Sequence, residues 1–170
     1  MDLKKYVREI PDFPEDGISF KDITPLLQNA KALESAAEAL FELIKNKKVD
    51  KVVGMESRGF FFAPLLATRL NAGFDPVRKR GKLPYRTISE PYALEYGADV
   101  LEIHVDGILK GEKILIHDDV LATGGTAKAV CKLIEKLGGE VVQCNFLLEL
   151  KFLMGREQLS GYPVQALIQY

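Results

Sequence analysis

The stretch that decides the fold is Ile114-Leu115-Ile116-His117-Asp118-Asp119-Val120-Leu121-Ala122-Thr123-Gly124-Gly125-Thr126. Its apolar first part, from Lys113, predicts a buried strand, and a helical pattern follows from about 126 to 137. Two carboxylates therefore arrive at the carboxyl end of a strand, which is where open α/β sheets bind ligands.

The glycine turn between this strand and helix has the features of a phosphate site. Gly124 and Gly125 leave backbone N–H groups accessible at a helix N-terminus, where the helix dipole favours an anion. Thr123 and Thr126 add hydroxyl donors, and the adjacent carboxylates can accept hydrogen bonds from vicinal hydroxyls. A ribose 5-phosphate would satisfy both halves. The plainer alternative for a bare Gly-Gly-Thr is a helix cap beside a solvated acidic turn. No lysine follows the glycines, so the segment is not a P-loop, and the Rossmann fingerprint is absent.

Outward from this segment, strand and helix patterns alternate. Helices are predicted at 30–47 and 60–70, the second with Pro64 in its first turn, and strands at 51–55, 140–148 and 163–169. Strands separated by helices predict right-handed βαβ units and a mainly parallel sheet. Residues 82–104 are irregular and rich in Tyr, Glu and Pro, which predicts an excursion from the sheet that serves as a lid.

Composition limits the class of protein. The chain has 170 residues, 47% apolar and 28% charged, with a formal charge of −1, as expected for one globular domain covering 1–170. This charge gives no broad basic field for nucleic acid, and no apolar run is long enough to span a bilayer. Cys131 and Cys144 predict buried thiols rather than a disulfide framework, and Met1 to Tyr6 lack the features of a signal peptide, so we expect a cytoplasmic protein with no nucleic-acid or membrane partner.

The acidic pair with Ala-Thr-Gly-Gly-Thr resembles the phosphoribosyl pyrophosphate (PRPP) signature of the type I phosphoribosyltransferases. Other segments resemble the adenine-specific members of that family, in matching order over nearly the whole chain. These are 12–14 with 17–25, Glu56-Ser57-Arg58-Gly59-Phe60, Arg78-Lys79-Arg80-Gly81-Lys82-Leu83-Pro84, Tyr92-Ala93-Leu94-Glu95-Tyr96-Gly97, and 155–157 with Leu159. The resemblance implies the type I phosphoribosyltransferase fold, an α/β fold with a mainly parallel twisted sheet flanked by helices. Residues 1–30 would form a small N-terminal hood and 82–104 a flexible catalytic lid.

The resemblance also implies a reaction of purine salvage, in which adenine and PRPP give AMP and pyrophosphate. In that family's pattern Asp118 and Asp119 meet the ribose hydroxyls, and the 5′-phosphate is held by Ala122, Thr123, Gly124, Gly125 and Thr126. Mg²⁺ would arrive on pyrophosphate oxygens, with water completing its shell and no direct protein ligand. A homodimer is implied as well.

Pyrophosphate binding is implied for Glu56, Ser57, Arg58, Arg78, Lys79 and Lys82. Arg58 follows a strand end, where a guanidinium can take two oxygens of an anion at once. The family pattern suggests a strained, cis Glu56–Ser57 peptide, and some side chains of the run at 78–82 would reach a neighbouring subunit's site. The plain alternatives are a surface arginine and a solvated basic run.

Base recognition is implied for Ser19, Phe20 and Lys21, with Phe20 stacking on adenine and Val120 on its other face. For Phe20, core packing is an equal alternative. In the lid, Glu95 would exchange a proton with N7 as the N9–C1′ bond forms, and Tyr96 would shield C1′ from water. Glu95 and Arg58 are thus the catalytic candidates.

Two rival functions remain: a phosphoribosyltransferase for hypoxanthine, guanine or xanthine, and a regulatory module that senses PRPP. The hood and the Leu-Glu-Tyr-Gly lid disfavour the first, and the lack of a spare nucleic-acid-binding segment disfavours the second. His117 stands where the family usually has an aliphatic residue. We expect a packed, satisfied imidazole there, and a structural role for His104.

Overall fold

The computed structural model describes residues 1–94 and 97–170. They divide into two compact units, Met1–Ala39 and Leu40–Tyr170, with the boundary inside helix α2 (Ala30–Glu42). No helix in these residues is both long and apolar enough to cross a membrane.

The first unit contains a short antiparallel ribbon. Strands β1 (Arg8–Ile10) and β2 (Phe20–Asp22) pair with Arg8 opposite Asp22, whose side chains lie 3.7 Å apart. The 3-10 helix η1 (Leu3–Tyr6) precedes the ribbon, and α1 (Thr24–Gln28), which the sequence analysis did not predict, follows it. Pro25 occupies the first turn of α1, where its missing N–H costs no hydrogen bond.

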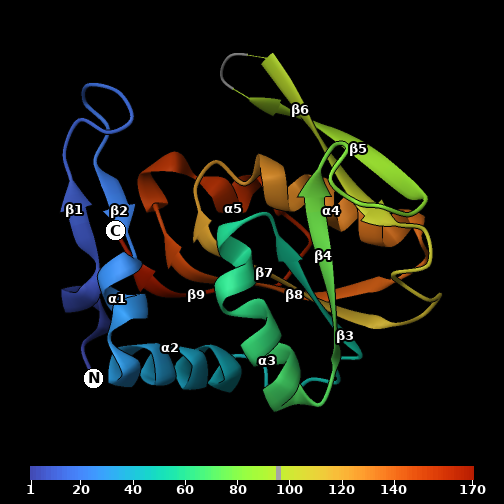
Figure 1. The fold of residues 1–170 in the computed structure, drawn as a ribbon, viewed down its shortest axis with the longest axis horizontal. Helices are drawn as coiled ribbons and strands as arrows, with labels where there is room; N and C mark the ends of the chain where they lie inside the picture. The colour runs from blue at the N-terminus through green and yellow to red at the C-terminus, as the bar shows by residue number, and fades with distance from the viewer. Residues whose placement is uncertain (95–96) are drawn as a thin grey trace. The chain divides into compact units, whose positions relative to one another are not determined.

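The second unit is built on one twisted sheet (Figure 1). In the described residues its strand order is β5-β6-β4-β3-β7-β8-β9, with parallel pairing from β4 through β9 and antiparallel pairing of β6 with β4 and β5. The strands are β3 (Lys51–Met55), β4 (Gly73–Lys79), β5 (Thr87–Leu94), β6 (Gly97–His104), β7 (Lys113–Leu121), β8 (Glu140–Glu149) and β9 (Val164–Gln169). The remaining elements are η2 (Arg58–Phe61), α3 (Ala63–Leu70), α4 (Gly125–Lys136), η3 (Lys151–Leu153) and α5 (Gly155–Gln158). The predicted mainly parallel α/β fold is confirmed.

Two expectations need correction. The strand predicted at 113–117 continues through Asp118 and Asp119 to Leu121. Within the predicted excursion at 82–104, residues 87–94 and 97–104 are regular and form the paired strands β5 and β6. The sequence does not show the usual alternation of apolar and polar residues in this hairpin, because the charged residue Glu90 takes a buried position. Lys132 and Lys136 of α4 neutralise it, at 3.1 and 2.6 Å.

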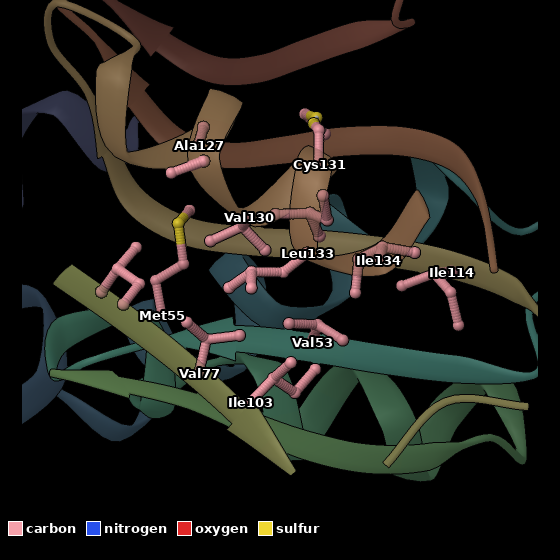
Figure 2. Close-up of a cluster of buried hydrophobic side chains, with 14 of the residues drawn as sticks. Val53, Met55, Val77, Ile103, Ile114, Ala127, Val130, Cys131, Leu133 and Ile134 are labelled. Atoms are coloured by element: carbon pink, nitrogen blue, oxygen red, sulfur yellow. The ribbon is translucent and has the colours of Figure 1, made fainter. Parts of the chain in front are cut away.

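Helices α3 and α4 pack on opposite faces of the sheet. Successive strand residues face opposite sides, and at Gly54 a β-carbon would meet Ala63 of α3 at 2.9 Å. The neighbouring Val53 and Met55 belong to the buried cluster on the other side, together with Val130 and Leu133 of α4 (Figure 2). This cluster fixes α4 on the sheet, and therefore fixes the turn that precedes α4.

Candidate active site

The end of β7 and the start of α4 form a small cavity of about 60 Å³. Its lining comes from Asp118, Val120, Leu121, the turn residues Ala122, Thr123, Gly124 and Thr126, and from Ala127 and Phe146. Gly124 has φ +85°, a conformation that suits glycine, and it precedes α4 with no side chain capping the helix. The first N–H groups of α4 are thus available to a ligand at its N-terminus.

Asp118 lines this cavity, and its neighbour Asp119 on β7 lies in different surroundings. Asp118 is half-buried and its Oδ1 accepts the Asp119 backbone N–H at 2.9 Å, whereas the Asp119 side chain is 2% exposed. Burial, reinforced by the neighbouring Asp119 charge, raises the pKa of Asp118 well above its ordinary value. Burial also raises the pKa of Asp119, and Arg58 opposes this rise. Such a pair favours nearby hydroxyl donors or cations.

Arg58 reaches the acidic pair from the loop after β3. Its Nε lies 3.2 Å from Asp119 Oδ2, and the side chain remains 41% exposed. The approach is close because residue 59 is glycine: a β-carbon there would lie 2.8 Å from the His117 carbonyl oxygen and 3.1 Å from Asp118 Oδ1. The Glu56–Ser57 peptide just before Arg58 is cis, as the sequence resemblance suggested.

Glu56 organises the basic run. Its buried carboxylate accepts the Lys79 backbone N–H at 2.8 Å, lies 3.5 Å from an Arg78 guanidinium nitrogen, and accepts a hydrogen bond from Lys82 Nζ. Burial alone would raise the pKa of Glu56, but these three donors lower it. Glu56 is therefore a carboxylate that holds cationic side chains in place.

Lys79 has a second carboxylate partner that the sequence analysis missed. Its Nζ lies 3.1 Å from Asp99 Oδ2 on β6, and the Tyr92 hydroxyl donates to the same oxygen at 3.2 Å. Tyr92 and Asp99 face each other across the hairpin, and burial together with the Asp99 charge raises the pKa of Tyr92 to about 12. The contact between Tyr92 and Asp99 follows from the register of the hairpin strands. The spacing of these two residues in the sequence does not predict it.

Three of the residues expected to read the base, Ser19, Phe20 and Lys21, lie in the first unit. Phe20 is half-buried in β2, with its ring centroid 5.2 Å from that of Phe13 in an edge-on arrangement. Lys21 Nζ lies 2.7 Å from Glu9 Oε1 and donates to Ser19 Oγ at 3.2 Å. Val120, expected on the other face of the base, lines the cavity described above. Glu95 and Tyr96 lie outside the described residues.

His117 is fully buried beside Phe62, with ring centroids 6.1 Å apart. Burial lowers its pKa to about 3, against a smaller effect of the Asn145 backbone, so the imidazole is neutral. Among residues 1–94 and 97–170 neither ring nitrogen has a hydrogen-bond partner of good geometry, and the polar group that acts on the imidazole is the Asn145 backbone. The buried packing agrees with the structural position expected for His117.

Known proteins resemble this chain over its whole length. The family model described as a phosphoribosyl transferase domain matches residues 21–152. The adenine phosphoribosyltransferase of Christiangramia forsetii is 65% identical over 170 residues, covering 100% of this chain and 99% of that protein.

Solved structures are also similar to this chain, in both fold and sequence. The crystal structure of adenine phosphoribosyltransferase from Thermoanaerobacter pseudethanolicus is 52% identical with a TM-score of 0.97, covering 99% of this chain and 98% of the other. The Saccharomyces cerevisiae enzyme, complexed with adenine and an imino-altritol bisphosphate, is 41% identical with a TM-score of 0.92, covering 97% and 96% of the two chains.

Proposed function

This chain belongs to the phosphoribosyl transferase family, among its adenine phosphoribosyltransferases, and from that premise we propose how its residues make AMP and pyrophosphate from adenine and PRPP. One observation carries the proposal: three features lie together at the carboxyl end of β7. They are the acidic pair of β7, the turn before α4, and Arg58.

We assign the ribose 5-phosphate half of PRPP to β7 and the turn. Asp118 and Asp119 accept hydrogen bonds from the two ribose hydroxyls. The 5′-phosphate binds in the cavity formed by 122–126, where the first N–H groups of α4 and the hydroxyls of Thr123 and Thr126 are donors. The fixed helix end supports this role because its donors need no rearrangement when the anion binds.

Pyrophosphate, the leaving group, is assigned to the cationic side chains of Arg58, Arg78, Lys79 and Lys82. Glu56 contributes by holding the Arg78 and Lys82 side chains and the Lys79 backbone N–H, because its own negative charge disfavours direct contact with an anion. The Ser57 backbone belongs to the same loop. Arg58 and Lys79 would stabilise the charge that develops on pyrophosphate as the C1′–O bond breaks.

Adenine is assigned to the residues that the sequence singled out. Phe20 stacks on the base, and backbone groups at Ser19 and Lys21 read its amino group and N1, with Val120 on the other ring face. Glu95 exchanges a proton with N7 while N9 attacks C1′, and Tyr96 excludes water from a sugar that resembles an oxocarbenium ion. Residues 1–30 serve as the hood and 82–104 as the lid within a single 1–170 domain.

Mg²⁺ is the proposed cofactor. Residues 1–94 and 97–170 contain no group of three or more His, Cys, Asp or Glu side chains placed to hold a metal. Substrate phosphates and water are common Mg²⁺ ligands, so we propose that pyrophosphate oxygens carry the ion into the site. When bound, the ion would neutralise part of the leaving group's charge.

We further propose a cytoplasmic homodimer. The free, buried thiols of Cys131 and Cys144, with sulfurs 3.7 Å apart, suit a reducing compartment. The dimer follows from the expected reach of the 78–82 run into a neighbouring site. Light scattering on the purified chain tests it, and a monomer at assay concentration would contradict it.

A substrate panel tests the proposed function. PRPP and Mg²⁺ are incubated with adenine, hypoxanthine, guanine or xanthine, and nucleotide formation is followed. AMP from adenine alone is expected. A nucleotide from an oxopurine would overturn the assignment of Ser19, Phe20 and Lys21, and PRPP binding with no turnover would favour a sensing module.

A further inference from the structure

The turn at 122–126 packs closely against the chain around Gly155. A β-carbon on Gly155 would lie 2.2 Å from the Ala122 carbonyl oxygen and 2.9 Å from Leu121 Cδ1, and one on Gly124 would lie 2.4 Å from the Gly155 carbonyl oxygen. The turn and the start of α5 are therefore in direct backbone contact, and the position of one fixes the position of the other.

Helix α5 cannot hold that position by its own stability. It has four residues, follows Met154, whose φ is 55°, and has no side-chain cap. Helices this short are unstable by themselves, so α5 depends on contacts with the rest of the fold. Buried Leu159, just after it, anchors its far end.

Arg156 supplies the contact at the near end. Its Nε and one terminal nitrogen donate to the two carboxylate oxygens of Glu149 at 2.7 and 2.9 Å, and its other terminal nitrogen donates to the Val164 carbonyl at 2.9 Å. The Glu149 side chain is 4% exposed. This two-point geometry holds a guanidinium in both position and orientation.

Glu149 in turn is fixed to β7, the strand that leads into the turn. It pairs with Leu121 in the parallel register, and the next residue, Leu150, donates its N–H to the Leu121 carbonyl at 2.9 Å. Gln169 of β9 also donates to Glu149, at 3.4 Å. The contacts form a closed path from Leu121 through Glu149, Arg156 and Gly155 back to Ala122.

We infer that Arg156 and Glu149 are positioning residues for the 5′-phosphate turn. They touch no substrate; they press Gly155 against Ala122 and so keep the N–H groups at the α4 N-terminus aimed at one point. The inference rests on the proposed role of 122–126. Loosening the pair would weaken binding of the ribose 5-phosphate half specifically, because small displacements of binding groups carry large penalties.

The test compares Arg156→Lys, which keeps the charge and loses the two-point geometry, with Glu149→Gln. The control is Glu140→Gln, because Glu140 lies at the opposite end of β8 from Glu149 and accepts a hydrogen bond from Lys113 of β7. Steady-state constants and inhibition by ribose 5-phosphate and by pyrophosphate are measured well below each variant's melting temperature.

For Arg156→Lys and Glu149→Gln we expect the KM for PRPP and the inhibition constant of ribose 5-phosphate to rise about tenfold or more. The KM for adenine and the inhibition constant of pyrophosphate should stay within about twofold, and Glu140→Gln should match the wild type. A lower melting temperature with unchanged PRPP and ribose 5-phosphate constants would overturn the inference and leave a structural ion pair.

Thr126→Val separates this inference from the proposed function. If Thr126→Val weakens ribose 5-phosphate binding and Arg156→Lys does not, the turn binds phosphate and the support role is wrong. If neither substitution matters, the phosphate assignment itself fails, and the inference with it. In the double variant the two effects should be less than additive, because both act on the same turn.

Discussion

Arg58 Nε lies 3.2 Å from Asp119 Oδ2, so one ion pair joins the loop after β3 to the end of β7. The two groups have unlike surroundings: the arginine side chain is 41% exposed, whereas the aspartate is almost fully buried. Arg58 can therefore meet an incoming anion while it still compensates the charge of a buried carboxylate. The groups proposed for ribose and for pyrophosphate are electrostatically linked before substrate binds.

Arg58→Ala should reduce kcat/KM for PRPP by about 100-fold or more, because a donor to the developing negative charge is lost. The KM for adenine should change little. The same substitution leaves Asp119 without its compensating charge, so we expect the pKa of Asp119 to rise further. Steady-state kinetics with each substrate varied in turn measures the effect, and a wild-type inhibition constant for pyrophosphate would contradict the assigned role.

Lys82→Ala should raise the KM for PRPP by about tenfold, the scale of one lost hydrogen bond between charged groups. Arg80→Ala is the matched control in the same loop. Arg80 is 75% exposed and its Nε lies 4.0 Å from Glu102, so its removal should change the KM by less than about twofold. Equal effects of the two substitutions would indicate a general field of positive charge rather than a specific site.

Glu95→Gln should lower kcat by about 100-fold or more, since the amide cannot exchange a proton with the base. The KM for PRPP should be nearly unchanged because Glu95 is assigned to the base and not to the phosphates. Measurement of kcat as a function of pH checks the assignment. Wild-type kcat in this variant would reduce Glu95 to a surface residue of the lid.

Asp75→Asn should stabilise the protein at pH 7.5 and not at pH 4. Asp75 is 7% exposed in β4, and burial raises its pKa to about 6, although Lys51 and His104 oppose the rise, while Asp106 and Glu112 add to it. Between about pH 4 and 6 the folded chain therefore binds more protons than the unfolded chain, and this group's contribution to stability falls as the pH rises through that range.

The gain of Asp75→Asn at pH 7.5 should be about 1 to 3 kcal/mol, from a pKa shift of about two units. Thermal unfolding at the two pH values measures it. Asp16→Asn is the control, because Asp16 is exposed and is not among the groups that shift the pKa of Asp75. An equal gain for Asp75→Asn at both pH values would mean that packing, and not charge burial, is responsible.

Much of the fold could be predicted because its central elements have strong local patterns. The apolar run at 51–55 and the run from Lys113 were recognisable as buried strands, and Pro64 lies in the first turn of α3 as expected. Strand β4 was missed because Asp75 and Pro76 interrupt its apolar character. The helix predicted at 30–47 ends at Glu42, and the chain continues in turns.

Some features of the candidate site could likewise be predicted from the sequence, and others could not. The sequence by itself determined the acidic pair, the glycine turn proposed for phosphate and the basic run, because each is a contiguous segment whose chemistry follows from its residue types. Only the tertiary structure decided the partners: Arg58 with Asp119, Lys79 with Asp99, and Arg156 with Glu149. The Arg58–Asp119 pair depends on how closely the loop after β3 approaches β7. The Lys79–Asp99 pair depends on strand register, and the Arg156–Glu149 pair depends on where the short helix α5 packs. Contacts of this kind are set by the packing of the whole sheet, which no local pattern of residues contains.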